Sequence, residues 1–228
     1  MANETMIGSA ARLSLIERLV RADRTRPTRL HDANGRLHLT PDILRAGTST
    51  FVRLAFKRYP RLPWLTYGAI RSLERLVAGR HVFEYGSGSS TGWFARHAAS
   101  IVSVENDAAW AQRVRHDLAD ISTASLIVAS NLEEMVNAIP ADRHFDLFVV
   151  DCQTAPGYGV TTEALRIRCL EAAMARARSG AVVVVDNTDA NKALSIEVDR
   201  FGQDRRVERH GGWVPGILHP NETVIIHV

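Results

Sequence analysis

A loop of small residues, 86–91 (Gly-Ser-Gly-Ser-Ser-Thr), follows a short apolar segment and leads into a helical pattern. Such residues let the backbone approach a ligand closely, and the start of the helix offers free N–H groups. Glu105 ends the next apolar segment, seventeen residues after Gly88, where its carboxylate can accept hydrogen bonds from ribose hydroxyls. Together these features indicate a site for a nucleoside-containing cofactor.

A second carboxylate, Glu84, precedes Gly86 by two positions. A negative charge at this place would repel the pyrophosphate of a dinucleotide, whereas it would attract a cofactor with a cationic amino-acid group. Dinucleotide sites also usually carry three glycines in this loop. The sequence therefore favours S-adenosylmethionine (SAM) over a nicotinamide dinucleotide.

At these residues the chain resembles the class I SAM-dependent methyltransferases. Residues 82–91 look like their motif I and residues 102–105 like their second motif, and the order of elements is similar from Trp64 to Val228. The most specific part of the likeness is residues 83–88 together with residues 104–107 and Trp110. The resemblance implies a methyltransferase that uses SAM as its cofactor.

The resemblance also implies which residues contact the cofactor. In order from the methionine portion through the ribose to the adenine, the expected set is Glu84, Gly86, Ser87, Gly88, Ser90 and Thr91, then Glu105 and Asn106, then Asn131 and Leu132. Ser90 stands where the family has its third glycine, and its hydroxyl and that of Thr91 would bind the SAM carboxylate. Asp151, at the end of the fourth predicted strand, would contact the cofactor near the methyl-transfer site.

The expected reaction is an in-line transfer of the SAM methyl group to an oxygen or nitrogen of a small-molecule or glycan acceptor. A hydroxyl acceptor must also lose its proton, and the candidate bases are Asp151, Asp186 and His219. We expect His219 and Trp213 in a loop, residues 211–221, at the ligand-side edge of the sheet.

Asp151, Asp186, Asn187 and Thr188 form a further set, because all of them end or follow neighbouring predicted strands. Their oxygens suit Mg²⁺, and the arrangement is similar to the metal set of catechol- and caffeoyl-CoA-type O-methyltransferases, whose metal lowers the pKa of the acceptor hydroxyl. Asp and Asn also end strands and cap helices without any metal. We assign no metal ligand, and Mg²⁺ stays an open alternative.

Three other functions compete with a small-molecule methyltransferase. Residues 88–92 match the G-x-S-x-G elbow of hydrolases, with Ser90 as nucleophile and Asp186 and His210 or His219 following in chain order. Gly86 and Ser87, however, separate that elbow from the strand. A nucleic-acid methyltransferase would use a basic segment, but aromatic residues do not alternate with the basic ones, so we expect no nucleic-acid partner. A non-catalytic scaffold would bind SAM without an acceptor pocket.

The elements that position these residues alternate between strand and helix, which indicates an α/β fold. We expect a doubly wound, Rossmann-like sheet of seven strands whose last strand is antiparallel. Strands are expected at residues 81–85, 101–105, 124–129, 145–151, 181–186, 206–209 and 223–228, the last two forming an antiparallel pair. Helices are expected at residues 91–98, 108–118, 132–138, 162–178 and 190–201.

Charge divides the chain into two parts. Residues 1–80 carry 15 Lys and Arg against 6 Asp and Glu, whereas residues 81–228 carry 13 against 19. Two helices are expected in the basic part, one around residues 13–20 and one over residues 64–77. We therefore predict an N-terminal helical cap, residues 1–80, on a SAM-binding domain, residues 81–228. The cap would shape the acceptor side or contact a second copy in a homodimer.

The composition predicts a cytoplasmic protein. Two cysteines, Cys152 and Cys169, are too few for a disulfide scaffold and fit a reducing compartment. The longest aliphatic run, residues 181–185, is far shorter than the ~20 residues that cross a bilayer. Charged residues interrupt the first 25 positions, which argues against a secretory signal.

Overall fold

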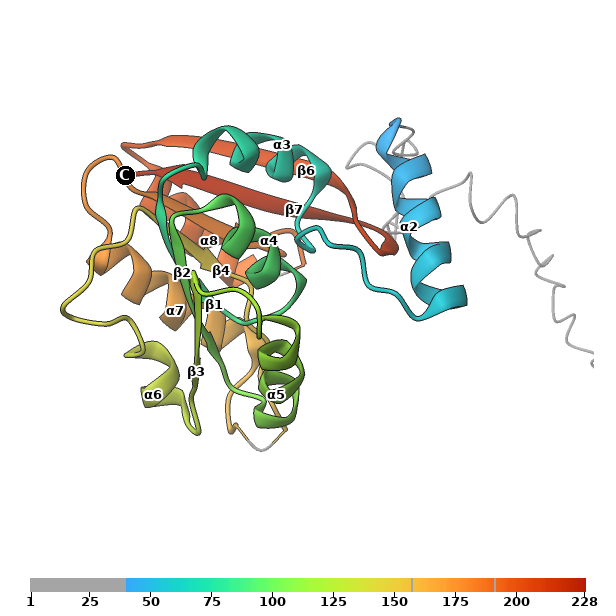
Figure 1. Cartoon of the computed structure of the whole chain (residues 1–228). Coiled ribbons are helices and arrows are strands. Elements are labelled where there is room, and N and C mark those ends of the chain that lie inside the picture. The colour runs from blue at the N-terminus through green and yellow to red at the C-terminus, as the bar shows by residue number, and fades with distance from the viewer. Residues whose placement is uncertain (1–39, 157, 191) are drawn as a thin grey trace, which may run out of the picture. The chain divides into compact units, whose positions relative to one another are not determined.

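The computed structural model describes residues 40–228 apart from Gly157 and Asn191 (Figure 1). The helix expected around residues 13–20 lies outside the described residues. Residues Pro41–Val228 form one compact unit. No helix in the described part of the chain is long and apolar enough to pass through a membrane.

Seven strands form one sheet in the order β3-β2-β1-β4-β5-β7-β6. They are β1 (His81–Tyr85), β2 (Ser100–Glu105), β3 (Ala124–Val128), β4 (Leu147–Val150), β5 (Val182–Asp186), β6 (Arg206–Val214) and β7 (Ile217–His227). The first five are parallel, and β7 runs antiparallel to both β5 and β6. The predicted fold class is therefore confirmed, including the antiparallel last strand.

The helices connect these strands and cover the sheet (Figure 1). They are α2 (Asp42–Phe56), α3 (Tyr67–Leu76), α4 (Ser89–His97), α5 (Ala108–Asp117), α6 (Leu132–Val136), α7 (Thr162–Arg176) and α8 (Lys192–Gly202). From β1 the chain winds outward to β3 and then returns to β4 and β5 on the other side of β1. Because crossovers are right-handed, this reversal puts α4 and α5 on one face and α7 on the other. A ligand crevice is expected at the reversal, where β1 and β4 end.

The core explains why the central strands could be recognised. Val182–Asp186 is buried at every position, as is Leu147–Val150, because parallel central strands are covered on both faces. Phe83 of β1 packs edge-on against Phe145, with ring centroids 5.4 Å apart, and against Tyr85 at 4.9 Å. These contacts fix the end of β1, from which the glycine loop departs.

The prediction of a loop at residues 211–221 is wrong, because these residues lie mostly in two long strands. β6 continues to Val214 and β7 already begins at Ile217, so only Pro215 and Gly216 make the turn. Gly216 has φ +79°, and a proline followed by such a glycine is typical of a type II turn. These two residues are enough to reverse the chain, so the hairpin does not need a longer loop.

This hairpin extends past the ligand-side edge of the sheet. Asp186, the last residue of β5, pairs with Thr223, so β7 residues before Thr223 lie beyond the end of β5. His219 is in that part of β7, and Trp213 is in β6, where it is buried. The two residues therefore lie on strands, and strand pairing fixes the face of the sheet on which each side chain lies.

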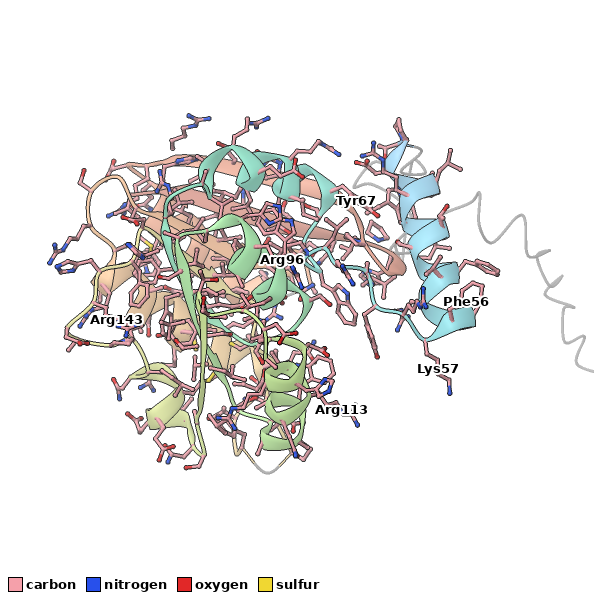
Figure 2. The ribbon with its side chains drawn as sticks, in the orientation of Figure 1. Phe56, Lys57, Tyr67, Arg96, Arg113 and Arg143 are labelled. Atoms are coloured by element: carbon pink, nitrogen blue, oxygen red, sulfur yellow. The ribbon has the colours of Figure 1, made fainter. Side chains whose placement is uncertain are left out.

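Helix α2 and the segment after it hold the hairpin tip. Arg53 donates from Nε to the Gly216 carbonyl at 2.6 Å, and the Gly216 N–H donates to Ser49 Oγ at 2.8 Å. A Cβ on Gly216 would lie 2.9 Å from Pro60, so the tip fits closely against this segment. Phe56 and Lys57 mark the end of α2 in Figure 2.

Candidate active site

The glycine loop lies directly against the end of β4. Gly86 donates its N–H to the Val104 carbonyl at 2.8 Å and has φ +89°. A Cβ added to Gly86 would lie 2.8 Å from both the Asp151 carbonyl oxygen and the Cys152 Cα. Only glycine fits this conformation and this approach, so the sequence places β1 and β4 in contact where they end.

Glu84 is fully buried beneath this loop. Its Oε2 accepts hydrogen bonds from Thr91 Oγ1 at 2.5 Å and from Ser103 Oγ at 2.8 Å. Its Oε1 is also buried, and no donor among the described residues reaches it. Burial raises the pKa of Glu84 to about 7, although the nearby hydroxyl groups of Ser90, Thr91 and Ser103 oppose this shift. A buried acceptor without a partner is rare in proteins, so Oε1 is a candidate acceptor for a cationic donor.

Thr91 connects the first turn of α4 to this carboxylate. Its hydroxyl accepts a hydrogen bond from the Gly88 N–H at 2.9 Å while it donates to Glu84. Ser90 is nearly buried as well, and its hydroxyl lies close enough to lower the pKa of Glu84. In this structure both hydroxyls therefore face Glu84, and a contact of either with a cofactor carboxylate stays a prediction.

Glu105 ties the end of β2 to the same loop. Its Oε2 accepts from the backbone N–H and the hydroxyl of Ser87, both at 2.9 Å, and its Oε1 accepts from the N–H groups of Asn106 and Asp107. Trp110 of α5 donates from Nε1 to the Ser87 carbonyl at 2.7 Å. The predicted ribose residue thus lies beside the predicted methionine residues, as strand pairing requires.

Two further predicted cofactor residues lie at the end of β3. Asn131 caps α6, since its Oδ1 accepts from the Glu134 N–H at 2.9 Å, and Leu132 is the first residue of that helix. Tyr158 donates from its hydroxyl to the Asn131 carbonyl at 2.5 Å. Asn106 reaches across to the Gln153 carbonyl at 2.8 Å, so the segment after β4 contacts the end of β2.

Asp151 and Asp186 lie where β4 and β5 end, but their side chains have different partners. Asp151 pairs with Arg166 of α7, with Oδ1 and Nη2 2.9 Å apart. Asp186 accepts from Thr223 Oγ1 at 2.6 Å and from Asn221 Nδ2 at 2.9 Å, both on β7. Burial raises the pKa values of Asp151 and Asp186, and the charge of Arg166 opposes the shift at each.

The contacts of Asp186 and His210 do not favour the hydrolase alternative. Both Asp186 oxygens bind β7, and the His210 ring nitrogen Nε2 lies 3.2 Å from Glu208 Oε2, so His210 is directed to Glu208 and not to Asp186. Within the described ranges, no three His, Cys, Asp or Glu side chains are grouped so that they could hold a metal.

Sequence reasoning missed several contacts that shape this site. Ser103 and Arg166 are the main ones, because they bind Glu84 and Asp151. The burial of Arg166 could have been predicted, since it shares a helix face with Cys169, Leu170 and Ala173, all buried, although its pairing with Asp151 could not. Ser103 gave no comparable signal, because a serine in a strand is ordinary.

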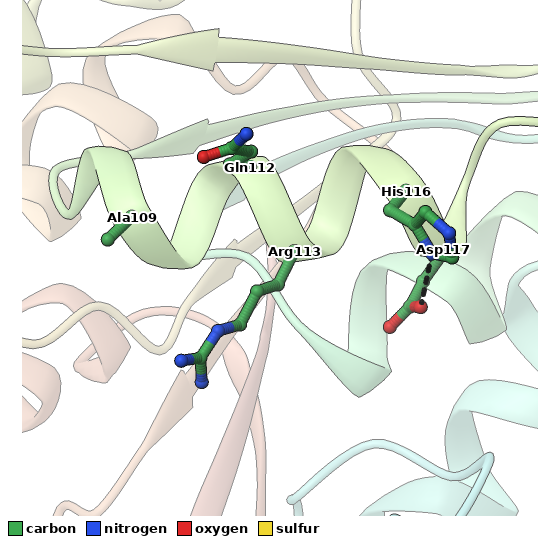
Figure 3. Close-up of a pocket in the computed structure, with 5 residues that line it drawn as sticks. All are labelled: Ala109, Gln112, Arg113, His116 and Asp117. Atoms are coloured by element: carbon green, nitrogen blue, oxygen red, sulfur yellow. Dashed lines mark ion pairs between the residues drawn. The ribbon is translucent and has the colours of Figure 1, made fainter.

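A hollow lies on the outer face of α5. It is lined by Ala109, Gln112, Arg113, His116 and Asp117 (Figure 3). His116 Nδ1 and Asp117 Oδ1 lie 3.6 Å apart. Arg113 is exposed there (Figure 2), whereas Ala111 and Val114 of the same helix are buried. The hollow contains none of the predicted site residues.

Comparisons with known proteins agree with this geometry. No family model and no curated protein matches the chain. Among solved structures, it resembles the O-methyltransferase TomG from Streptomyces achromogenes, solved in complex with SAM, at 19% identity, with a TM-score of 0.55, over 81% of this chain and 89% of that one.

Two further structures show the range of these neighbours. An O-methyltransferase from Bacillus cereus, in complex with S-adenosylhomocysteine (SAH), has 17% identity and a TM-score of 0.56, over 83% of this chain and 93% of that one. An rRNA methylase from Streptococcus thermophilus has 13% identity and a TM-score of 0.50, over 68% of this chain and 90% of that one. The chain therefore has the fold of the class I SAM-dependent methyltransferases.

Proposed function

We propose that this protein binds SAM at the ends of β1, β2 and β3 and transfers its methyl group to an oxygen or nitrogen of a small-molecule or glycan acceptor. One observation carries the proposal: the buried Oε1 of Glu84 reaches no donor among the described residues. The ammonium of the methionine portion is a donor of the right charge for this atom. The glycine loop beside it allows the close backbone approach that such a ligand needs.

The other predicted cofactor residues support this orientation. Glu105, at the end of β2, is the acceptor for the ribose hydroxyls, and these would compete with its present donors on Ser87. Asn131 and Leu132 follow β3 and are the candidate adenine contacts. The methyl group would then lie toward Asp151, where β4 ends.

The acceptor would enter from the side of the β6–β7 hairpin. Residues 49–60 contact the hairpin tip, which supports an acceptor-side role for the predicted cap, residues 1–80. Asp151, Asp186 and His219 remain the candidate bases for a hydroxyl acceptor. Of these, Asp151 has one carboxylate oxygen, Oδ2, that accepts no hydrogen bond from the described residues, and its side chain is 20% exposed. We therefore favour Asp151 as the base.

The direct test is calorimetry of the full chain with SAM, SAH and NAD⁺. We expect SAM and SAH to bind with micromolar dissociation constants, on the order of 8 kcal/mol of binding free energy, and NAD⁺ not to bind. Absence of binding by both SAM and SAH at millimolar concentration would refute the proposal.

A nucleic-acid methyltransferase is the second candidate. The rRNA methylase among the structural neighbours favours it, as do the basic side chains of residues 41–80. These are Arg45, Arg53, Lys57, Arg58, Arg61, Arg71, Arg75 and Arg80. Retention on immobilised RNA that falls steeply with salt would favour this acceptor class, whereas the small-molecule proposal predicts no retention at physiological salt.

A reducing, cytoplasmic location remains our expectation, with Cys152 and Cys169 as free thiols.

A further inference from the structure

Arg166 is a charged side chain in a buried position. It lies on α7 and is only 2% exposed. Removing a guanidinium from water is costly unless its donors are paired. Arg166 meets most of this need, because four of its five N–H donors are paired: Nε donates to the Cys152 carbonyl at 2.7 Å, and the two terminal nitrogens donate to three further oxygens.

Those three oxygens come from the ends of β4 and β5. Nη2 donates to Asp151 Oδ1 at 2.9 Å, and Nη1 donates to the Asp186 carbonyl at 2.6 Å and to Asn187 Oδ1 at 2.8 Å. Asn187 has φ +60°, a left-handed conformation that is uncommon outside glycine. Its side-chain contact with Arg166 helps to hold this unusual conformation.

The same side chains are the ones whose types suit Mg²⁺. Two of them, Asp151 and Asn187, direct an oxygen to the guanidinium, while both oxygens of the third, Asp186, bind Asn221 and Thr223. A divalent ion needs six or more oxygens at about 2.0–2.6 Å. It would also lie close to a permanent positive charge, which repels it. The residues present therefore do not fit a metal ion.

We propose that Arg166 is the built-in cation of this site: it occupies the place between Asp151 and Asn187 that a divalent metal would take, and it positions Asp151 toward the acceptor. An arginine suits this role because its charge is permanent and its planar donors match several oxygens at once. Whether a metal binds does not depend on SAM binding, so failure of one proposal is distinguishable from failure of the other.

The metal part is tested by titrating the full chain with Mn²⁺ and measuring free Mn²⁺ by electron paramagnetic resonance. The comparison is between the wild type and Asp151→Asn. We expect equal binding by the two proteins, because any bound ion is held elsewhere. Binding of one Mn²⁺ per chain by the wild type that Asp151→Asn abolishes would overturn the proposal.

The role of the charge is tested by thermal unfolding of Arg166→Met, Asp151→Asn and the double variant. We expect Arg166→Met to lower the melting temperature by roughly 6–20 °C, because it leaves Asp151 without a counter-charge. The double variant should unfold at a higher temperature than Arg166→Met, since the uncompensated carboxylate is gone.

Arg166→Lys is the conservative control and should recover part of the loss. Additive losses in the double variant, with Arg166→Lys no better than Arg166→Met, would show that Arg166 acts through packing alone and would contradict the proposal. Should Arg166→Met fail to fold, folding of the double variant supports the charge role, and failure of both leaves the decision to the Mn²⁺ titration, which needs neither variant.

Discussion

Glu84 is the residue on which the proposed function depends most, and its ionisation should be visible in stability. Its pKa in the folded chain is about 7, above the ordinary value near 4.3. A raised folded pKa gives stability that is complete below the unfolded value and is lost as pH rises through about 7. The Glu84→Gln variant lacks this loss. Relative to the wild type, its melting temperature should therefore rise by roughly 6–12 °C between pH 5 and pH 8.

Thermal unfolding at several pH values measures this difference, with Glu171→Gln, at an exposed position of α7, as a control. A constant difference between Glu84→Gln and the wild type would contradict the assignment of the pKa. The same ionisation should affect the ligand, because only ionised Glu84 attracts the ammonium of SAH. We expect the affinity of the wild type for SAH to increase from pH 6 to pH 8.

Gly86 offers a second test at the residue scale. An alanine there would place its Cβ 2.8 Å from the Asp151 carbonyl oxygen and would keep φ +89°. The loop must then move, so SAH affinity should fall by about tenfold or more. Gly180→Ala is a matched control, because Gly180 has φ +86° but a Cβ there meets nothing within 4 Å. Equal SAH affinity in Gly86→Ala and Gly180→Ala, measured by calorimetry, would count against the loop as the binding site.

At the scale of elements, one hydroxyl connects three of them. Thr223 of β7 accepts from the Thr66 N–H at the start of α3, at 3.1 Å, and donates to Asp186 at the end of β5. Thr223→Val removes the hydrogen bonds of the buried Thr66 N–H and of Asp186 Oδ1, and we expect the melting temperature to fall by roughly 4–12 °C. Thr223→Ser keeps the hydroxyl and should lose much less. Scanning calorimetry of the two variants gives the comparison, and equal losses would mean that the hydroxyl is unimportant.

The sequence was sufficient for elements whose pattern is local. β1 was predicted with the bounds that the structure has, His81–Tyr85, because a buried apolar strand ends there in a glycine loop. The bounds of the final two strands were not predicted correctly, because Gly211, Gly212 and Pro220 are typical of loops. Pairing with β7 and contacts to α2 hold β6 extended despite these residues. The Pro215–Gly216 pair was the available signal for a tight turn.

The candidate site likewise has residues that the sequence predicts and contacts that it does not. Glu84, Gly86 and Glu105 could be predicted because they stand at strand ends with recognisable spacing. The partners of Asp151 and Asp186 could not, because Arg166 and Thr223 are distant in sequence and meet them only through the packing of α7 and β7. Side-chain partners of this kind depend on tertiary structure, which a single sequence does not encode in any short pattern.

At the scale of the molecule, residues Pro41–Val228 form one compact unit. This unit contains the sheet, both helical layers and α2, which contacts the hairpin tip. We therefore expect the fragment 41–228 to unfold cooperatively, with a melting temperature within roughly 3 °C of the full chain and unchanged SAH affinity. Scanning calorimetry and SAH titration of the fragment check this. A fragment that is unfolded, or that loses SAH, would show that residues 1–40 are part of the cofactor domain.

The measurement that tests the central claim most directly is a crystal structure of the full chain soaked with SAH. The ligand should lie across the ends of β1, β2 and β3, with its ammonium within hydrogen-bond distance of Glu84 Oε1 and its ribose hydroxyls on Glu105. Its sulfur should point toward Asp151. SAH bound elsewhere, or bound with its ammonium away from Glu84, would contradict the proposed cofactor site.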